Sequence, residues 1–291
     1  MIGFDLNKTK RHFTEMLAER FTLREAEQLM RILLEDLFDI DLKRQVMEPA
    51  LRLTEEQEAR LRQSVNALLL GSPVQYVTGK AWFDGLLLHV DESVLIPRPE
   101  TEEMVERMAA KLPQDQPVRI WDVGTGSGCI AIALAKRFPL AEVTAFDISE
   151  KALTVARQNA LANGVKVEFV CDDALNPQSD RWGRTVDVVV SNPPYIRESE
   201  KASMEPNVLD HEPHAALFVP DKDPLLFYRQ ILQTARRQLS SGGLVGFEIN
   251  EAMGDEMVQL GHTLGFEVEI QNDFCEKNRF VFLSLLSKYN D

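Results

Sequence analysis

From residue 118 onward, short apolar runs alternate with segments whose apolar residues recur every three or four positions. Short runs bounded by turn residues predict buried strands, and the longer spacing predicts helices. The predicted strands are 118–123, 142–146, 166–171, 186–191, 244–249, 267–271 and 280–285, and the predicted helices are 129–137, 151–163, 225–239 and 252–264. This alternation predicts an α/β fold with a mostly parallel sheet and helices on both faces. Because no helix separates the last two strands, we expect an antiparallel end to the sheet.

The first 70 residues have a different pattern, which is that of several helices. Apolar residues at helical spacing form separate faces within 13–21, 26–37 and 61–69. Thr22 with Glu25, and Thr54 with Gln57, have the spacing of capping boxes. We therefore predict a bundle of four or five helices. We interpret it as a substrate-recognition domain, and a purely structural cap is an equally good interpretation.

A short connecting segment is predicted between these two parts. Gly71-Ser72-Pro73 ends the last helix of the bundle. Asp84-Gly85 stands between two apolar runs, which is typical of a β-hairpin. Thr101 is expected to cap a helix that extends to about residue 112. The predicted domains are 1–73 for the helical bundle, 74–97 for a β-hairpin linker and 98–291 for the α/β part.

Composition narrows the class of protein. The chain has 291 residues and is 44% hydrophobic, enough for a buried core. No apolar segment reaches the ~18 residues needed to cross a membrane, and the N-terminus lacks a signal-peptide pattern. Cys129, Cys171 and Cys275 are few and widely spaced, so we expect neither a disulfide framework nor a metal site, and a cytoplasmic location. A net charge of −14 argues against sequence-independent binding to nucleic acid, and we expect a monomer.

A glycine-rich loop, Asp122-Val-Gly-Thr-Gly-Ser-Gly128, connects the first strand of the α/β part to its helix. Glycines allow a tight turn and the close approach of a ligand. A dinucleotide-binding loop has the spacing Gly-x-Gly-x-x-Gly, whereas this loop has Gly-x-Gly-x-Gly after an acid. The acid could hold a cationic amine, so we favour S-adenosyl-L-methionine, which carries an ammonium and a sulfonium but no phosphate. The candidate cofactor residues here are Asp122, Gly124, Thr125, Gly126, Ser127 and Gly128.

Acidic residues also follow the next two strands. Asp147, with Ile148 beside it, is placed to accept the hydroxyls of a ribose. As an alternative, Asp147 serves only as the N-cap of the following helix. Asp172 and Asp173 follow the third strand, where one carboxylate is expected to accept the adenine amino group and the other to serve as a turn residue. These acids and the glycine loop together predict a site for a nucleoside-containing methyl donor.

The fourth strand ends in Asn192-Pro193-Pro194-Tyr195. The Asn192 side-chain oxygen and the Pro193 carbonyl can accept both hydrogens of a planar amino group. The two prolines stiffen the backbone, and the Tyr195 ring can pack on the planar group and exclude water. Holding the nitrogen ~3–3.5 Å from an activated methyl is then most of the catalysis. We also expect Asn192 to contact the cofactor; the alternative for the tetrad is a proline-rich turn that merely ends a strand.

These residues resemble the release factor glutamine methyltransferases (the PrmC/HemK family) among the class I S-adenosylmethionine-dependent methyltransferases. The resemblance extends over essentially the whole chain. Its motifs are Leu95-Ile-Pro-Arg-Pro-Glu-Thr-Glu102, the glycine loop, Ser191-Asn-Pro-Pro-Tyr-Ile196, Glu212-Pro213 and the segment ending at Glu248. It implies a Rossmann-like methyltransferase sheet with an N-terminal helical bundle and a hairpin linker.

The resemblance also implies an activity. It implies transfer of a methyl group to the N5 amide nitrogen of the glutamine in the Gly-Gly-Gln motif of peptide chain release factors. S-adenosyl-L-homocysteine would be the product, and no metal would be needed. It places Arg98 and Glu100 in the lining of the cofactor or substrate pocket; as an alternative, these two residues form an internal salt bridge.

Two other functions compete with this one. An adenine-N6 methyltransferase of nucleic acid would share the Asn-Pro-Pro-Tyr tetrad. The acidic charge balance and the lack of a basic or aromatic-basic segment argue against it. A cofactor-binding protein without activity is the second alternative, and the intact tetrad argues against that one.

Overall fold

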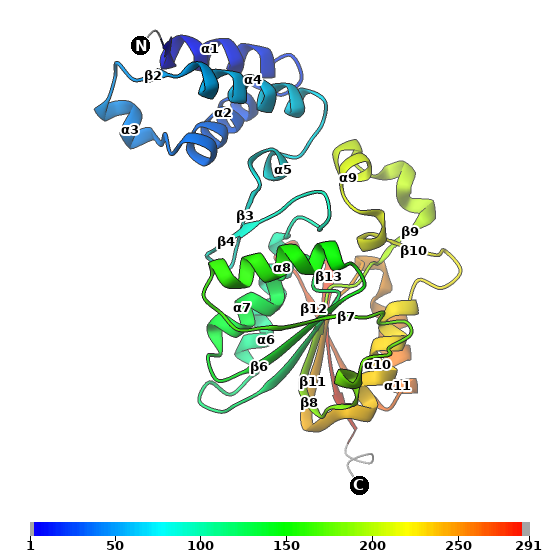
Figure 1. Cartoon of the computed structure of the whole chain (residues 1–291). Coiled ribbons are helices and arrows are strands. Elements are labelled where there is room, and N and C mark those ends of the chain that lie inside the picture. The colour runs from blue at the N-terminus through cyan, green and yellow to red at the C-terminus, as the bar shows by residue number, and fades with distance from the viewer. Residues whose placement is uncertain (1–2, 287–291) are drawn as a thin grey trace. The chain divides into compact units, whose positions relative to one another are not determined.

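The computed structural model describes residues 3–286 and divides them into two compact units. The first unit contains the chain up to Lys80 together with the segment Glu205–His211. The second contains Ala81–Met204 and the chain from Glu212 onward. Figure 1 traces the chain through both units, from blue at the N-terminus to red at the C-terminus. No helix within the described residues is long and apolar enough to cross a membrane.

The first unit is helical, in agreement with the sequence prediction. Between residues 3 and 80 its helices are α1 (Leu6–Leu17), α2 (Leu23–Phe38), α3 (Leu42–Met47), α4 (Glu55–Leu69) and α5 (Val74–Thr78). The capping boxes predicted at Thr22 and Thr54 are both present, so α2 and α4 begin where the sequence indicates. A short antiparallel pair, β1 (Phe4–Asp5) with β2 (Arg52–Leu53), was not predicted. Apolar side chains of α1, α2 and α4 form the core of this unit.

The second unit is built on a seven-stranded sheet with the strand order β12-β13-β11-β8-β5-β6-β7. Its strands are β5 (Arg119–Val123), β6 (Glu142–Asp147), β7 (Glu168–Cys171), β8 (Val186–Ser191), β11 (Leu239–Glu248), β12 (Phe266–Asn272) and β13 (Asn278–Leu285). The strands from β11 to β7 run parallel to one another, and β13 runs antiparallel to both of its neighbours, β11 and β12, which confirms the predicted antiparallel end of the sheet. The strand order reverses between β5 and β8. In such sheets, ligands bind at the carboxyl ends of the strands at this point.

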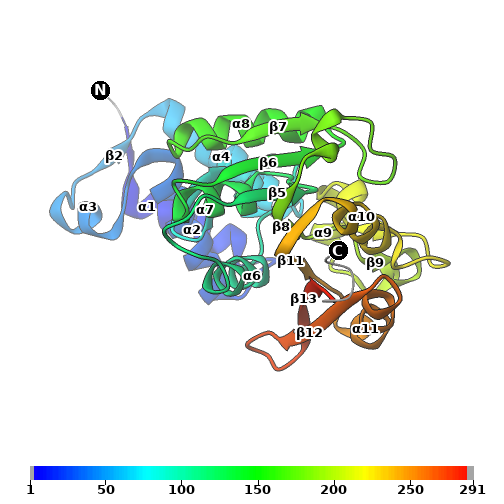
Figure 2. The same cartoon turned by 90° about the horizontal axis from the view of Figure 1, so that it is seen from below.

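Helices cover both faces of the sheet, as the alternation predicts. The helices are α6 (Pro99–Ala110), α7 (Cys129–Arg137), α8 (Glu150–Ala162), α10 (Leu226–Gln238) and α11 (Gly254–Thr263). Figure 2 shows α6 and α7 on one side of the sheet and α10 and α11 on the other. Side chains alternate along each strand, so Ile120 and Val188 pack under α6 and α7, while Trp121 and Val189 pack under α10.

The predicted hairpin is present as β3 (Lys80–Phe83) and β4 (Leu86–His89). Asp84 and Gly85 have φ of 51° and 71°, the left-handed pair that a tight two-residue hairpin turn requires. Asn159 of α8 accepts a hydrogen bond from the His89 N–H at 2.7 Å and donates to the carbonyls of His89 and Ser127, each at 2.9 Å. One buried amide therefore links the hairpin to the glycine loop.

The start of α6 differs from the prediction. The helix begins at Pro99 with Arg98 as its N-cap, so the predicted capping role of Thr101 is wrong. Proline is favoured at the first helical position because its fixed φ suits the helix and its missing N–H costs no hydrogen bond there. Thr101 consequently lies inside the first turn, where it is buried and its hydroxyl is available for another contact.

The segment between β8 and α10 contains short elements that the sequence pattern did not predict. These are β9 (Ile196–Arg197), η2 (Glu198–Ser203), α9 (Pro206–His211), η3 (His214–Ala216) and β10 (Phe218–Val219). β9 and β10 form a two-residue parallel pair. Elements this short leave too few residues for a hydrophobic period to be recognised.

Candidate active site

The glycine loop leaves the carboxyl end of β5, beside the reversal of strand order. Gly124 and Gly126 have φ of 74° and 53°, and a Cβ on either would meet no atom within 4 Å. At Gly128, with φ of 83°, a Cβ would lie 3.1 Å from the Cβ of Ala156. The first two glycines therefore leave one face of the loop open to a ligand, while the third allows α7 and α8 to pack closely.

Asp122 lies beneath this loop and is 0% exposed. Its Oδ2 accepts hydrogen bonds from the Thr125 hydroxyl at 2.6 Å and from the Ala131 N–H at 3.1 Å. Its Oδ1 is buried and accepts no hydrogen bond from residues 3–286. Burial raises the pKa of the Asp122 carboxyl to about 7. An unpaired buried carboxylate oxygen is costly, so this atom fits a site that receives a positively charged group.

Asp147 ends β6, and its carboxylate accepts a hydrogen bond from the glycine loop. Its Oδ2 accepts from the Gly126 N–H at 2.9 Å, and its Oδ1 accepts from the Ser149 N–H at 2.8 Å. The N-cap of α8 is Ser149, so the alternative in which Asp147 caps this helix is wrong. Burial raises the pKa of Asp147, and Ile148 beside it is 65% exposed. The structure brings Asp147 and the glycine loop into direct contact.

The two acids after β7 have different surroundings. The Asp172 carboxylate accepts from the N–H groups of Ser179 at 2.5 Å and Gln178 at 3.1 Å, and from the indole N–H of Trp182 at 2.9 Å. Asp173 accepts through Oδ1 from the Leu175 N–H at 2.8 Å. Asp172 therefore organises the loop that follows β7, and Asp173 is the less engaged of the two carboxylates.

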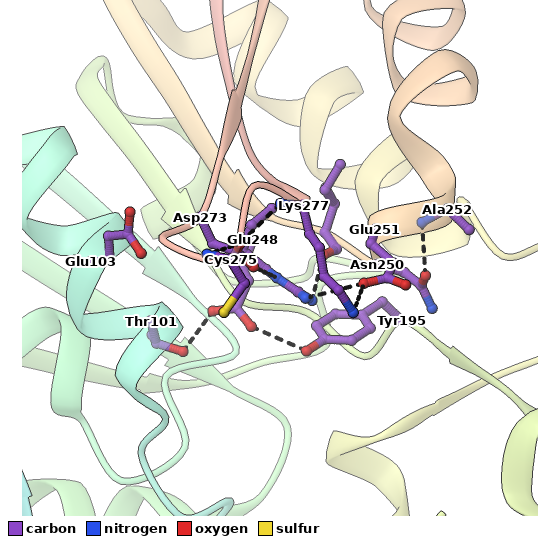
Figure 3. A network of polar contacts seen from close by, with 12 residues as sticks. Thr101, Glu103, Tyr195, Glu248, Asn250, Glu251, Ala252, Asp273, Cys275 and Lys277 are labelled. Atoms are coloured by element: carbon purple, nitrogen blue, oxygen red, sulfur yellow. Dashed lines mark hydrogen bonds and ion pairs between the residues drawn. The ribbon is translucent and has the colours of Figure 1, made fainter. Parts of the chain in front are cut away.

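The Asn-Pro-Pro-Tyr tetrad follows β8, next to β5 in the sheet. Asn192 donates through Nδ2 to the Thr101 hydroxyl oxygen at 3.0 Å. The Thr101 hydroxyl and the Tyr195 hydroxyl both meet the Glu248 carboxylate, at 2.6 and 3.1 Å. Figure 3 shows Thr101 and Tyr195 bonded to the two oxygens of Glu248. Within residues 3–286, no donor meets Asn192 Oδ1 or the Pro193 carbonyl, the two acceptors that the sequence analysis selected for a planar amino group.

Thr101 and Glu248 contact the tetrad through hydrogen bonds to Asn192 and Tyr195, and the sequence did not identify either of them as a site residue. Glu248 is 1% exposed at the end of β11, and burial raises its pKa, while the nearby Arg279 charge lowers it. Arg279 itself pairs with Asp273 at 3.1 Å. A glutamate that ends an otherwise apolar strand is the signal that could have identified Glu248, because buried carboxylates need partners.

Arg98 has a partner other than the predicted one. Its guanidinium lies 2.5 Å from the carboxylate of Glu212, which is 4% exposed and also accepts from the Ile96 N–H at 3.3 Å. The predicted alternative of an Arg98–Glu100 salt bridge is therefore wrong. Residues two apart at a helix start point to different sides, so Glu100 cannot face Arg98. Through these two contacts, Glu212 fixes the position of the 96–98 segment within the second unit.

A cavity of about 630 Å³ lies at the opposite, amino-terminal edge of the sheet. Its lining includes Arg119, Asp187 and Ser240. The Arg119 guanidinium donates two hydrogen bonds to the Asp187 carboxylate, at 2.9 and 3.0 Å, the Arg119 N–H donates a third at 2.9 Å, and the Ser240 hydroxyl donates to the same carboxylate at 2.6 Å. The cavity therefore offers a ligand few unsatisfied groups, and the candidate site remains at the carboxyl edge.

Similarity to known proteins agrees with this geometry. A family model described as the methyltransferase small domain matches residues 101–211, and one described as the PrmC N-terminal domain matches residues 10–79. A solved methyltransferase structure from Pyrococcus furiosus is similar over 78% of this chain and 96% of its own length. The TM-score is 0.50 and the sequence identity is 20%. This likeness supports the fold alone.

Two curated relatives are similar over almost their whole length. A release factor glutamine methyltransferase of Flavobacterium psychrophilum is 41% identical over 92% of this chain and 95% of its own length. The enzyme of the same name from Bacteroides thetaiotaomicron is 38% identical over 95% of this chain and 99% of its own length. With this similarity and a methyltransferase fold, the chain belongs to the release factor glutamine methyltransferase family.

Proposed function

We propose that this protein transfers a methyl group from S-adenosyl-L-methionine to the N5 amide nitrogen of the glutamine in the Gly-Gly-Gln motif of peptide chain release factors. The observation that carries the proposal is the pair of unused acceptors, Asn192 Oδ1 and the Pro193 carbonyl, beside an open glycine loop. The names of relatives that are 41% and 38% identical support the choice of acceptor.

The residues of the glycine loop fit S-adenosyl-L-methionine. The unpaired Asp122 Oδ1 suits the ammonium group, and the open faces of Gly124 and Gly126 allow close approach. Asp147 would accept the ribose hydroxyls and Asp173 the adenine amino group, since Asp172 is engaged within its own loop. When bound, this cofactor supplies a methyl group that is already activated by its sulfonium, and S-adenosyl-L-homocysteine remains.

The tetrad would prepare the amide. An amide nitrogen is a weak nucleophile because its lone pair is delocalised into the carbonyl. Asn192 Oδ1 and the Pro193 carbonyl would accept both N–H groups, which aims the nitrogen and increases its electron density. Pro193 and Pro194 keep the backbone rigid, and Tyr195 would pack on the planar group and exclude water.

The first unit is proposed to recognise the release factor, which acts in the cytoplasm during translation. Its helix α3 carries exposed apolar side chains: Leu42 is 56% exposed, Val46 80% and Met47 70%. Neighbouring exposed apolar residues on one short helix are typical of a protein-binding surface. A role in protein recognition would also account for the presence of the unit beside a complete methyltransferase fold.

The proposal is tested by methyl transfer with three acceptors offered side by side. The purified chain is incubated with radiolabelled S-adenosyl-L-methionine and a release factor, the same factor with Gly-Gly-Gln changed to Gly-Gly-Ala, or plasmid DNA. We expect label on the unmodified factor alone, with one added methyl on its glutamine by mass spectrometry. Label on the DNA or the Gly-Gly-Ala factor, with none on the unmodified factor, would overturn the proposal and favour the adenine-N6 alternative.

A further inference from the structure

We propose that Thr101 and Glu248 are positioning residues that determine which end of the Asn192 amide faces the acceptor. The inference rests on the function proposed above and deepens it. It concerns how this site distinguishes an amide, which donates hydrogen bonds through its –NH2, from a carboxylate of nearly the same shape.

Glu248 is 1% exposed and accepts a hydrogen bond from a hydroxyl at each of its two oxygens. Oε2 lies 2.6 Å from the Thr101 hydroxyl and Oε1 lies 3.1 Å from the Tyr195 hydroxyl. The Thr101 and Tyr195 hydroxyls donate to these two oxygens, and each hydroxyl has a single hydrogen to donate. The Thr101 hydrogen is therefore directed to Glu248.

The direction of this bond fixes the next one. With its hydrogen used, Thr101 Oγ1 can only accept, so Asn192 must turn its Nδ2 toward it, as observed at 3.0 Å. Oδ1 then necessarily occupies the other end of the amide, where a substrate N–H can reach it. An amide rotated by 180° would place an –NH2 against the –NH2 of a glutamine, with donor facing donor. The Thr101–Glu248 pair therefore sets the site to accept hydrogen bonds.

The same contacts also join α6 to β11, so a purely structural role must be separated from a positioning role. Loss of a structural link lowers stability but does not change the preference between two ligands of equal size. Loss of the hydrogen-bond direction does change it, because a rotated Asn192 would donate to a carboxylate. The preference between glutamine and glutamate in the acceptor is thus the informative measurement.

The experiment uses the full chain and four variants. Thr101→Val keeps the shape but removes the hydroxyl, and Thr101→Ser restores a hydroxyl. Glu248→Gln introduces an –NH2 that can donate. Tyr228→Phe is the matched control, because the Tyr228 hydroxyl donates at 3.0 Å to the main-chain carbonyl of Glu248 and not to its side chain.

Two quantities are measured for each protein, with its melting temperature and its affinity for S-adenosyl-L-homocysteine as folding controls. One is kcat for a release factor. The other is the ratio of dissociation constants for a release factor with its Gly-Gly-Gln motif and the same factor with the motif changed to Gly-Gly-Glu, in the presence of S-adenosyl-L-homocysteine. We expect Thr101→Val to lower kcat at least tenfold and to shift the ratio at least fivefold toward Gly-Gly-Glu. Thr101→Ser should recover most of both, and Glu248→Gln should lie between.

Tyr228→Phe should lower the melting temperature and leave the ratio at its wild-type value. An unchanged ratio in both Thr101→Val and Glu248→Gln would overturn the inference, whatever happens to kcat. A ratio that shifts as much in Tyr228→Phe would overturn it as well, since the effect would then follow from loosened packing. Failure of the wild-type chain to methylate any release factor would instead count against the proposed function, so the two results are distinguishable.

Discussion

Two buried carboxylates stand at the same edge of the sheet, and they are satisfied in opposite ways. Asp122 is the second-last residue of β5 and is 0% exposed; Glu248 ends β11 and is 1% exposed, with β8 between the two strands. Burial raises the pKa of both. Both oxygens of Glu248 accept hydroxyl hydrogens, whereas Asp122 keeps one oxygen without a protein donor within residues 3–286. A satisfied carboxylate can direct neighbouring hydrogen bonds, and an unsatisfied one can receive a cation.

This contrast divides the proposed site into two halves. The loops after β5, β6 and β7 would hold the cofactor, and the residues after β8 and β11 would hold the acceptor amide. The Asn-Pro-Pro-Tyr tetrad follows β8, which lies beside β5. If the division is correct, substitutions in one half should change turnover and those in the other should change cofactor affinity.

The largest effect is expected for Asn192→Ala in the acceptor half. Removing one preorganised hydrogen-bonding group from an active site costs roughly 10²–10³-fold in kcat. We expect a loss of about this size, with the dissociation constant of S-adenosyl-L-homocysteine changed less than about threefold. Steady-state kinetics and calorimetry measure the two quantities. Asn163→Ala, which removes an amide that bonds the Leu87 carbonyl away from this edge, is the control. Equal turnover in Asn192→Ala and wild type would remove Asn192 from the mechanism.

Asp122→Asn should act on cofactor affinity instead. Burial raises the pKa of the carboxyl to about 7 in the free protein, the Asp147 carboxylate raises it as well, and the Thr125 hydroxyl and Ala131 N–H lower it as donors. A bound ammonium favours the ionised form, so affinity for S-adenosyl-L-homocysteine should fall as pH drops below about 7, by up to about tenfold per unit. The variant should bind about 10–100-fold more weakly at pH 7.5 and lose this pH dependence. Calorimetry between about pH 5.5 and 7.5 tests it; a variant with the wild-type pH profile would contradict the role of Asp122.

The same substitution should make the free protein more stable at high pH. The folded pKa of Asp122 lies above its unfolded value, so its contribution to folding is most favourable below about pH 4 and is lost as pH rises to about 7. An asparagine carries no such penalty. We expect Asp122→Asn to raise the free energy of unfolding by about 1–2 kcal/mol at pH 8, and to give little or no gain at pH 5. Urea unfolding at the two pH values measures the difference; equal gains at both would show that ionisation of Asp122 is not the cause.

Asp147→Ala should have a smaller effect on the same half. It removes the proposed ribose contact and the bond to the Gly126 N–H at 2.9 Å. We expect cofactor affinity to fall about 5–10-fold, or about 1 kcal/mol, with kcat at saturating cofactor less affected. Calorimetry provides the measurement. Unchanged affinity would leave Asp147 with only the loop contacts seen in the structure.

The sequence predicted most of the sheet because its strands are short apolar runs between turn residues, and α7 and the hairpin turn lie at the predicted positions. It also placed the glycine loop and the tetrad at the strand ends. It did not reveal partners far apart in the chain, such as Thr101 with Glu248 or Arg98 with Glu212, since side-chain pairing across the fold leaves no periodic pattern. The complete burial of Asp122 also depends on the folded loop above it, so its raised pKa could not be predicted.

The smallest effect is expected outside both halves, on the proposed docking surface of α3. Met47 is 70% exposed, and an aspartate there would place a charge in a protein interface without disturbing a core. We expect Met47→Asp to raise KM for the release factor about threefold, with kcat and cofactor affinity at wild-type values. Leu161→Asp, at an 83% exposed apolar position on α8 in the second unit, is the matched control and should leave KM unchanged. A similar rise in both variants would indicate a general effect of the added negative charge, and no rise in either would leave the first unit without a recognition role at α3. The three classes of substitution would then be separated by one parameter each: kcat for the acceptor half, cofactor affinity for the glycine-loop half, and KM for the first unit.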